Sequence, residues 1–293
     1  MGLNLRKFMF SGSALLIVMT LCAVQSVKAQ ELDGTLKRIK ASSTINLGYV
    51  QFAPPFSLLG PDKVPAGYSI DLCKHVASVI QKQLNVNLKL NWVEVTTENR
   101  MNLVDQGKVD LECSTSTITL SRQDKVDFSL MTFIDGASFL TLTSSPIRSL
   151  SDLSGKRIAV IPGTTTEKAL AKFLKDEFIT AVTVPVKDHT EGRTALERGN
   201  VAALASDQGI LIGLALTTAD PKRFTLSDRL ISYEPYGFML HRNDAAFRTA
   251  VNRALAGLYR SGEVLAIYDR WFGVLGKPSE ALKGMYMLNG LPE

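Results

Sequence analysis

The feature that most constrains the fold of this chain is a regular alternation of short apolar runs with longer segments of helical periodicity. Runs such as INLGYV (45–50) and GKRIAVIPG (155–163) predict strands, because β-branched residues favour extended structure. Between these runs, segments such as residues 69–85 place apolar side chains at helical spacing. Strands that alternate with helices of this length indicate an α/β protein with parallel sheets.

The alternation occurs as two consecutive series, which indicates two α/β lobes. The expected strands are 45–50, 88–95, 109–114, 126–129, 137–143, 155–163, 181–186, 201–206 and 236–242. The expected helices are 69–85, 97–107 with Thr97 as its N-cap, 164–178, 191–199, 244–262 and 263–273. The tail from Lys277 is expected to be polar surface.

The first 29 residues have the pattern of a secretory signal peptide and are set aside from the fold. A positively charged start precedes an apolar run over residues 14–24, and Val27 and Ala29 are small residues two positions apart. The apolar run is shorter than the roughly 20 residues that a membrane-spanning helix needs. We therefore expect cleavage after Ala29 and export; a retained membrane anchor is the alternative.

Cleavage at this point would change the charge of the protein. The full chain carries a net charge of +5, but the 264 residues that remain contain 30 basic and 28 acidic side chains, a net charge of +2. No basic tract is left to neutralise a phosphate backbone, which argues against nucleic-acid binding. At about 100–200 residues per domain, the remaining length suggests two compact units.

Two cysteines remain after cleavage, Cys73 and Cys113. One pair of cysteines in an exported protein is a candidate disulfide, worth roughly 3–4 kcal/mol of stability for a loop of this length; two buried free thiols are the alternative. The histidines His75, His189 and His241 are scattered along the chain. We expect no metal site and no cofactor.

Loops that follow strands carry the candidate ligand-binding residues, as expected for open α/β sheets. In LECSTSTITLSRQDKVDFS (111–129), Thr115 and Thr117 offer hydroxyl groups that can donate and accept hydrogen bonds. Ser121 is the expected cap of the following turn. Arg122 offers a planar guanidinium that can bind a carboxylate through two hydrogen bonds.

Two further loops add complementary groups. In PGTTTEKAL, Thr164 and Glu167 have capping-box spacing at a helix start, and free N–H groups there favour an anion beside Thr165 and Thr166. Asp207 directly follows an apolar strand, where its carboxylate can receive an ammonium group. A cation, hydroxyls and helix N–H groups for a carboxylate, together with an anion for an amine, indicate a free α-amino acid as the ligand.

The order and spacing of several motifs resemble the periplasmic solute-binding proteins of polar amino acid ABC transporters, family 3, and most closely their glutamate/aspartate-binding branch. The matching motifs are PPFS, AGYSIDLC, VTTENRMNLVDQGKVDLECSTST, SRQDKVDFS, PGTTTEKAL, KDHTEGRTALERG, SDQGIL and YGFML. The resemblance implies the type II periplasmic-binding-protein fold, with two lobes joined by two crossovers. Lobe 1 is expected at 30–134 and 238–293, and lobe 2 at 135–237.

The resemblance also implies three groups of ligand contacts: to the α-carboxylate, to the α-ammonium and to the side chain. The matching residues are, in that order, Arg122, Thr117, Thr165 and Thr166; Asp207 and Thr115; and Arg100, Thr97 and His189. It further implies a periplasmic monomer whose lobes close over an L-amino acid. The closed form is then handed to the membrane permease of an ABC transporter.

One departure from the family pattern affects the side-chain pocket. The acidic-amino-acid branch carries an arginine after the first strand, in a pattern like G-x-R-E-S-x-P-P-F-S, whereas this chain has GYVQFAPPFS with Val50 in its place. A side-chain carboxylate would lose one cationic partner, although Arg100 remains. Glutamate or aspartate is the expected ligand, and a neutral polar amino acid such as glutamine is the alternative.

The rival class of function is enzymatic, because cyclohexadienyl dehydratases use the same two-lobed fold. Such an enzyme needs an acid that protonates a leaving hydroxyl, and Glu112 and Glu191 are the nearest candidates. Neither belongs to a recognisable catalytic constellation. We therefore expect a binding protein and no enzyme. Docking on a sensory receptor in place of a permease is a third alternative that the residues do not distinguish.

Overall fold

The computed structural model describes residues 32–147 and 149–292. The predicted signal peptide, residues 1–29, lies outside the described residues. Among the described residues, no helix has both the length and the apolar character needed to cross a bilayer.

The first sheet has the strand order β5-β1-β6-β13-β7. Its strands are β1 (Thr44–Tyr49), β5 (Lys89–Glu94), β6 (Leu111–Glu112), β7 (Val126–Asp135) and β13 (Glu234–His241). Strands β5, β1 and β6 are parallel, and β13 runs antiparallel to both β6 and β7. The elements packed around this sheet include α1 (Gly34–Ser42), α2 (Tyr68–Leu84), α3 (Arg100–Asp105), α4 (Leu120–Gln123) and α8 (Ala245–Ser261).

The second sheet has the strand order β10-β9-β11-β8-β12. Its strands are β8 (Ala137–Leu142), β9 (Arg157–Val160), β10 (Val182–Pro185), β11 (Ala203–Asp207) and β12 (Phe224–Leu226). The helices that accompany it are α5 (Thr165–Asp176), α6 (His189–Glu197), α7 (Gln208–Leu216) and the short 3-10 turns η1 (Leu150–Leu153) and η2 (Pro221–Arg223). Strand β8 is antiparallel to β11 and β12.

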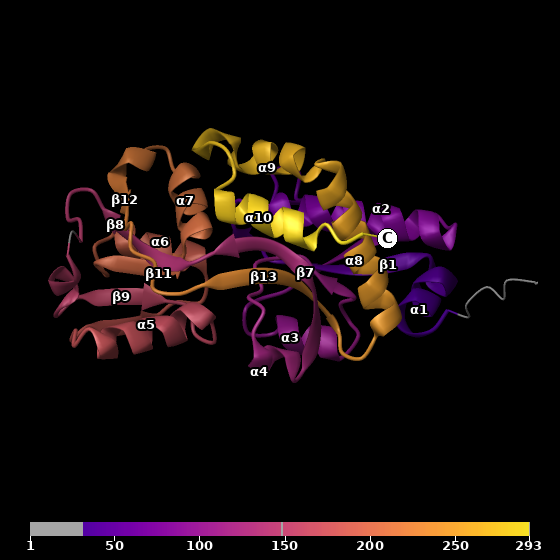
Figure 1. Cartoon of the computed structure of the whole chain (residues 1–293). Coiled ribbons are helices and arrows are strands. Elements are labelled where there is room, and N and C mark those ends of the chain that lie inside the picture. The colour runs from indigo at the N-terminus through magenta and orange to yellow at the C-terminus, as the bar shows by residue number, and fades with distance from the viewer. Residues whose placement is uncertain (1–31, 148, 293) are drawn as a thin grey trace, which may run out of the picture. The chain divides into compact units, whose positions relative to one another are not determined.

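The predicted α/β class is confirmed, but both sheets are mixed and not purely parallel. The antiparallel strands are those next to the two passages of the chain between the sheets, β7 to β8 and β12 to β13. At these passages β7 and β13 lie side by side (Figure 1). Asp135 at the end of β7 is paired with Glu234 at the start of β13. The exact lobe boundaries, at 134/135 and 237/238, stay a prediction.

A small third sheet, β2 (Phe52–Ala53), β3 (Ser57–Leu59) and β4 (Pro65–Ala66), follows β1. It delivers Phe56, which is fully buried, to an aromatic cluster beside the passages. The Phe56 ring lies 4.9 Å from that of Phe133 on β7 and 5.5 Å from that of Tyr236 on β13, measured between centroids. Edge-to-face packing of this kind fixes where the Tyr236 hydroxyl points.

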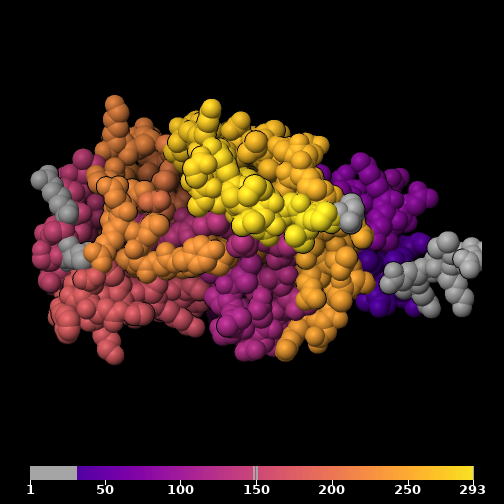
Figure 2. Space-filling view, in the orientation of Figure 1, coloured from indigo at the N-terminus to yellow at the C-terminus, as the bar shows by residue number. Residues whose placement is uncertain are grey.

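The C-terminal tail is helical, which corrects the expectation of a polar surface segment. Helix α9 (Val264–Phe272) is followed by the turn η3 (Gly273–Leu275) and by α10 (Glu280–Asn289). Helix α10 buries Leu282, Met285 and Tyr286 against β7 and α8, and it is the yellow segment across the face shown in Figure 2. The Tyr286 hydroxyl lies 2.7 Å from that of Tyr68 on α2.

The helix predicted over residues 97–107 is shorter than expected. Helix α3 begins at Arg100, and Thr97 lies in the turn before it. Thr96 and Asn99 exchange side-chain-to-backbone hydrogen bonds across this turn, so the predicted N-cap at Thr97 is wrong.

Helices α1 and α7 and strand β12 were not predicted. In α9, Val264, Tyr268 and Phe272 are buried, whereas Ile267 and Trp271 are only partly buried.

Candidate functional site

The loop that follows β6 is covalently anchored at its base. Cys73 on α2 and Cys113 form a disulfide, with their Cα atoms 6.1 Å apart and both side chains fully buried. The anchored loop then carries Thr115 and Thr117 toward the second sheet. The disulfide alternative for the cysteine pair is the one present in the structure.

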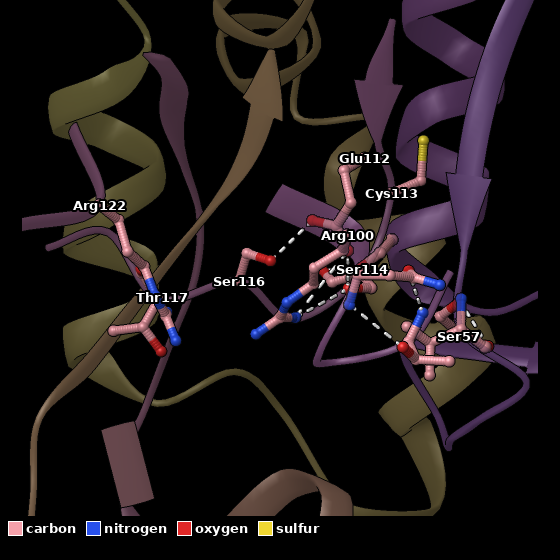
Figure 3. Close-up of polar contacts among 12 residues, drawn as sticks. Ser57, Arg100, Glu112, Cys113, Ser114, Ser116, Thr117 and Arg122 are labelled. Carbon is pink, nitrogen blue, oxygen red and sulfur yellow. Dashed lines mark hydrogen bonds and ion pairs between the residues drawn. The ribbon is translucent and has the colours of Figure 1, made fainter. Parts of the chain in front are cut away.

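A buried polar cluster surrounds Glu112 at the end of β6 (Figure 3). Its carboxylate accepts hydrogen bonds from the hydroxyls of Ser114 and Ser116, the latter at 2.7 Å. An Nη1–Oε1 distance of 3.9 Å pairs Arg100 with Glu112, and the same nitrogen donates to Ser114 Oγ at 3.4 Å. Arg100 is only 8 % exposed. It is therefore a buried, partly neutralised cation and not a surface helix residue.

Arg122 lies on the short helix α4, whose start is fixed by Thr119. The Thr119 hydroxyl accepts a hydrogen bond from the backbone N–H of Arg122, so Thr119 and not the predicted Ser121 is the cap. The guanidinium Nη1 donates to the carbonyl oxygen of Thr117 at 2.8 Å. Burial, together with the nearby charge of Arg100, lowers the pKa of Arg122 to about 10. The group stays protonated at neutral pH.

The start of α5 forms as the sequence predicts. The Thr164 hydroxyl accepts from the backbone N–H of Glu167 at 3.0 Å, and the Glu167 carboxylate accepts from the backbone N–H of Gly163 at 2.8 Å. The capping contact confirms the predicted helix start, although Glu167 reaches Gly163 in place of Thr164. Thr165 and Thr166 are consequently the first two residues of α5.

Asp207 ends β11 and is held by two hydroxyl donors. Thr166 Oγ1 donates to its Oδ1 at 2.9 Å, and the Tyr236 hydroxyl donates to its Oδ2. Burial, followed by the negative charge of Glu234, raises the pKa of Asp207 to about 6, against the two hydrogen bonds. Burial and the charge of Asp207 likewise raise the pKa of Asp135 to about 7.

Glu234, at the start of β13, was not predicted as a site residue. Its Oε2 accepts hydrogen bonds from Thr117 Oγ1 at 2.5 Å and from Thr165 Oγ1 at 2.7 Å. The hydroxyls of Thr117 and Thr165 lie 3.2 Å apart. The sequence signal was limited to an acidic residue directly before the apolar run PYGFML. Its full burial, which requires hydrogen-bond partners for the carboxylate, is evident only in the structure.

His189 is the first residue of α6, and Asp188 is the cap of that helix. One ring nitrogen lies 2.9 Å from the carbonyl oxygen of Phe52, and the other lies 2.9 Å from Ser206 Oγ. Burial lowers the pKa of His189 to about 4. The imidazole is therefore neutral at pH 7 and can only take part as a polar, uncharged group.

The other positions singled out in the sequence differ in how far they are buried. Thr115 is buried and Thr97 is half-buried. Val50 is also half-buried, and both its backbone N–H and its carbonyl lie 2.9 Å from the Ser57 hydroxyl. Because this contact uses only the backbone of Val50, its side chain is not needed for the turn.

A chain of contacts joins most of the residues that were predicted to bind the α-carboxylate and the α-ammonium of the ligand. Arg122 contacts Thr117, Thr117 contacts Thr165, and the neighbouring Thr166 contacts Asp207. The charge of Arg100 affects the pKa of Arg122, Asp207 and His189, which puts Arg100 within electrostatic reach of all three. Residues from both sheets thus meet at one place.

The two acids considered for an enzyme have other partners. Glu112 accepts from two serines beside Arg100. Glu191 is exposed and accepts from the backbone N–H of Lys187 at 2.7 Å, at the start of α6. Within the part of the chain that the structure describes, no group of three or more His, Cys, Asp or Glu side chains is arranged to hold a metal ion.

Similarity to known proteins identifies the family of this chain. Residues 45–274 match the family described as bacterial extracellular solute-binding proteins, family 3. The chain is 39 % identical over 249 residues to the L-glutamate/L-aspartate-binding protein of Pseudomonas aeruginosa, covering 84 % of this chain and 82 % of that protein. It is 30 % identical over 245 residues to the glutamate/aspartate import solute-binding protein of Salmonella typhimurium, covering 83 % and 81 %.

Among solved structures, the ancestral amino acid-binding protein AncCDT-1, described as a precursor of cyclohexadienyl dehydratase, has a TM-score of 0.71 at 27 % identity. The match covers 82 % of this chain and all of that one. The two-lobed fold expected from the sequence is therefore confirmed, and so is the resemblance to the glutamate/aspartate-binding branch. The chain belongs to family 3 of the bacterial extracellular solute-binding proteins.

Proposed function

We propose that this protein binds a free L-amino acid, with glutamate or aspartate preferred, and delivers it to the membrane permease of an ABC importer. The observation that carries the proposal is the meeting of a protonated guanidinium, threonine hydroxyls and a buried carboxylate from three separate loops. Arg122 suits the α-carboxylate and Asp207 suits the α-ammonium. Oppositely charged groups placed in this way match the two ends of a zwitterion.

The geometry supports recognition between the two sheets. Thr117 belongs to the loop after β6, whereas Thr165, Thr166 and Asp207 belong to the second sheet and its helix α5. A ligand held by both sets is released when the sets separate. Opening and closing about the β7–β13 passage would then load and unload the protein.

The preference for an acidic side chain rests on Arg100 and on the relatives. The proteins from Pseudomonas aeruginosa and Salmonella typhimurium carry glutamate and aspartate in their names. Arg100 is a buried cation that can face a side-chain carboxylate. Its pairing with Glu112 and the presence of Val50 weaken that attraction, which keeps glutamine as the second candidate ligand.

The proposed site of action is the periplasm, after cleavage of residues 1–29. The family description and the composition of the first 29 residues support export. A monomer suits a carrier that presents one face of each lobe to a permease. The structural roles of Glu112 and Glu191 favour a binding protein over a dehydratase.

Calorimetry of residues 30–293 against all twenty amino acids tests the proposal. The protein should first be unfolded and refolded, so that ligand carried from expression is removed. We expect micromolar or tighter binding of glutamate or aspartate, which is at least about 8 kcal/mol. Absence of heat with every amino acid would overturn the proposal. Turnover of a prephenate-like acid would point to the enzyme class instead.

A further inference from the structure

The strongest unassigned feature of the molecule is the carboxylate of Glu234. It lies at the first residue of β13, opposite Asp135 at the end of β7, where the chain passes between the two sheets. The side chain is only 1 % exposed. Among the described residues, the side-chain groups that donate hydrogen bonds to it are hydroxyls.

Three hydroxyls surround this carboxylate. Ser232 Oγ donates to Oε1 at 2.6 Å, while Thr117 and Thr165 both donate to Oε2. Thr117 comes from the loop anchored by the disulfide, and Thr165 is the first residue of α5. One oxygen atom of Glu234 therefore connects the ligand-facing loops of both sheets.

The number of protons decides what the two threonines can do next. A hydroxyl group has one proton to donate and two lone pairs that accept. Once Thr117 and Thr165 have each donated to Glu234, neither proton is left for a second partner. Their remaining lone pairs can accept a hydrogen bond, but the hydroxyls cannot donate to a ligand carboxylate.

We propose that Glu234 is a positioning residue that sets the polarity of the ligand site, by taking the hydroxyl protons of Thr117 and Thr165. In this state both hydroxyls face an ammonium group as acceptors, alongside Asp207. The α-carboxylate is left to Arg122 and to the free N–H groups at the start of α5. The site then requires a free α-ammonium and disfavours acids that lack one.

This assignment rests on the proposed function and deepens it. It gives the side-chain hydroxyls of Thr117 and Thr165 to the opposite end of the ligand from the one that the sequence resemblance implied. The negative charge of Glu234 also favours an ammonium group beside Thr117 and Thr165. The same charge raises the pKa of Asp207 and the pKa of Arg122.

The test compares L-glutamate with 2-oxoglutarate, which has the same carboxylates but no ammonium group. Wild-type protein and the Glu234→Gln variant are titrated with both by calorimetry. We expect Glu234→Gln to weaken glutamate binding at least tenfold without weakening 2-oxoglutarate. The amide carries no negative charge, and its NH2 group, when it faces Thr117 and Thr165, accepts no proton and leaves both hydroxyls able to donate to ligand oxygens. The ratio of the two dissociation constants should therefore fall at least tenfold.

A matched control removes a buried carboxylate elsewhere. Asp110 is 3 % exposed and accepts from the backbone N–H of Asn46 and from Arg38. Asp110→Asn should lower thermal stability and leave the glutamate to 2-oxoglutarate ratio unchanged. If Glu234→Gln does not fold, Thr165→Val and Thr165→Ser replace it. The valine variant should lose glutamate selectively, and the serine variant should retain it.

The outcomes separate this inference from the proposed function. An unchanged ratio in Glu234→Gln, or an equal loss of both ligands, overturns the role of Glu234 while amino-acid binding stands. Wild-type protein that binds no amino acid overturns both.

Discussion

The two ends of the proposed ligand site differ in how their charges are balanced. At the α-amino-acid end, Arg122 and Asp207 carry opposite charges on different sheets, and each is oriented by neighbours that leave its charge intact. At the side-chain end, Arg100 is paired with Glu112 and His189 is neutral. We therefore propose that the first end recognises the groups common to all α-amino acids, and that the second end distinguishes their side chains through a cation whose charge is partly neutralised.

The largest effect is expected from changes at the α-amino-acid end. Arg122→Ala or Asp207→Ala should weaken amino-acid binding at least about 100-fold, because a buried charge of the ligand loses its partner. The midpoint of thermal unfolding should move by less than about 4 °C, equivalent to about 1 kcal/mol at this size. Calorimetry and thermal melts measure the two quantities.

Arg248→Ala is the control for this prediction, because it removes an arginine that pairs with Asp127 elsewhere on the first sheet. It should leave affinity unchanged. Extensive unfolding of the Arg122 or Asp207 variant would instead give these residues a structural role.

A smaller and selective effect is expected at the side-chain end. Arg100→Met should weaken glutamate binding by about 10- to 100-fold, the loss of one charge-assisted interaction, and glutamine binding by only a few-fold. The double variant Arg100→Met with Glu112→Gln controls for the buried acid left without its partner. If the double variant loses affinity for glutamate and for glutamine equally, Arg100 does not distinguish the charge of the ligand's side chain.

The α-amino-acid end should also respond to pH, whereas His189 should not. Asp207 must be ionised to receive an ammonium, and its pKa is raised to about 6 in the ligand-free protein. Affinity should therefore fall about tenfold between pH 7 and pH 5. Asp207→Asn should bind weakly at both values, with this pH dependence removed.

The stability of the ligand-free protein should rise as the pH is lowered, whereas its affinity for the amino acid should fall. The pKa values of Asp135 and Asp207 are raised from 3.8 to about 7 and about 6, so both bind protons more tightly in the folded state. Their contribution to stability is complete below pH 3.8 and is lost as the pH rises through 6 to 7. When the pH is lowered from 8 to 5, the midpoint of thermal unfolding of the ligand-free protein should rise. In Asp135→Asn it should rise by less. Parallel changes of affinity and stability would contradict this assignment.

The smallest effect is expected from restoring a cation beside Arg100. Val50→Arg should raise the preference for glutamate over glutamine about three- to tenfold, since its backbone contacts with Ser57 do not depend on the side chain. Val50→Met supplies a long uncharged side chain for comparison. Loss of all binding in Val50→Arg, with Val50→Met active, would mean that position 50 does not face the ligand's side chain.

Local sequence patterns predicted the strands and helices that have a buried and an exposed face. Helix α8 buries Phe247, Val251 and Leu255 at the predicted spacing. Helix α7 was missed because GILIGLAL is apolar on all sides and shows no helical period. Helix α10 did carry a signal, with Ser279 as its N-cap before Leu282, Met285 and Tyr286, but the polar residues around it obscured the pattern.

In the candidate site, the sequence predicted those groups whose position follows from the local structure of a single loop. The hydroxyls of Thr164 and Thr166 and the carboxylate of Asp207 follow strands directly, so their location could be inferred. Glu234 could not be assigned in this way. Its role depends on the pairing of β13 with β7 and on the approach of Thr117 to Thr165, contacts between residues far apart in the chain.

The central claim is that the guanidinium of Arg122, beside the first sheet, and the carboxylate of Asp207, on the second sheet, bind the α-carboxylate and the α-ammonium of one amino acid. A crystal structure of residues 30–293 with L-glutamate tests it most directly. The account predicts the α-carboxylate on the Arg122 guanidinium and the α-ammonium on the Asp207 carboxylate. A bound glutamate in the reverse orientation, or one that touches neither residue, would contradict it.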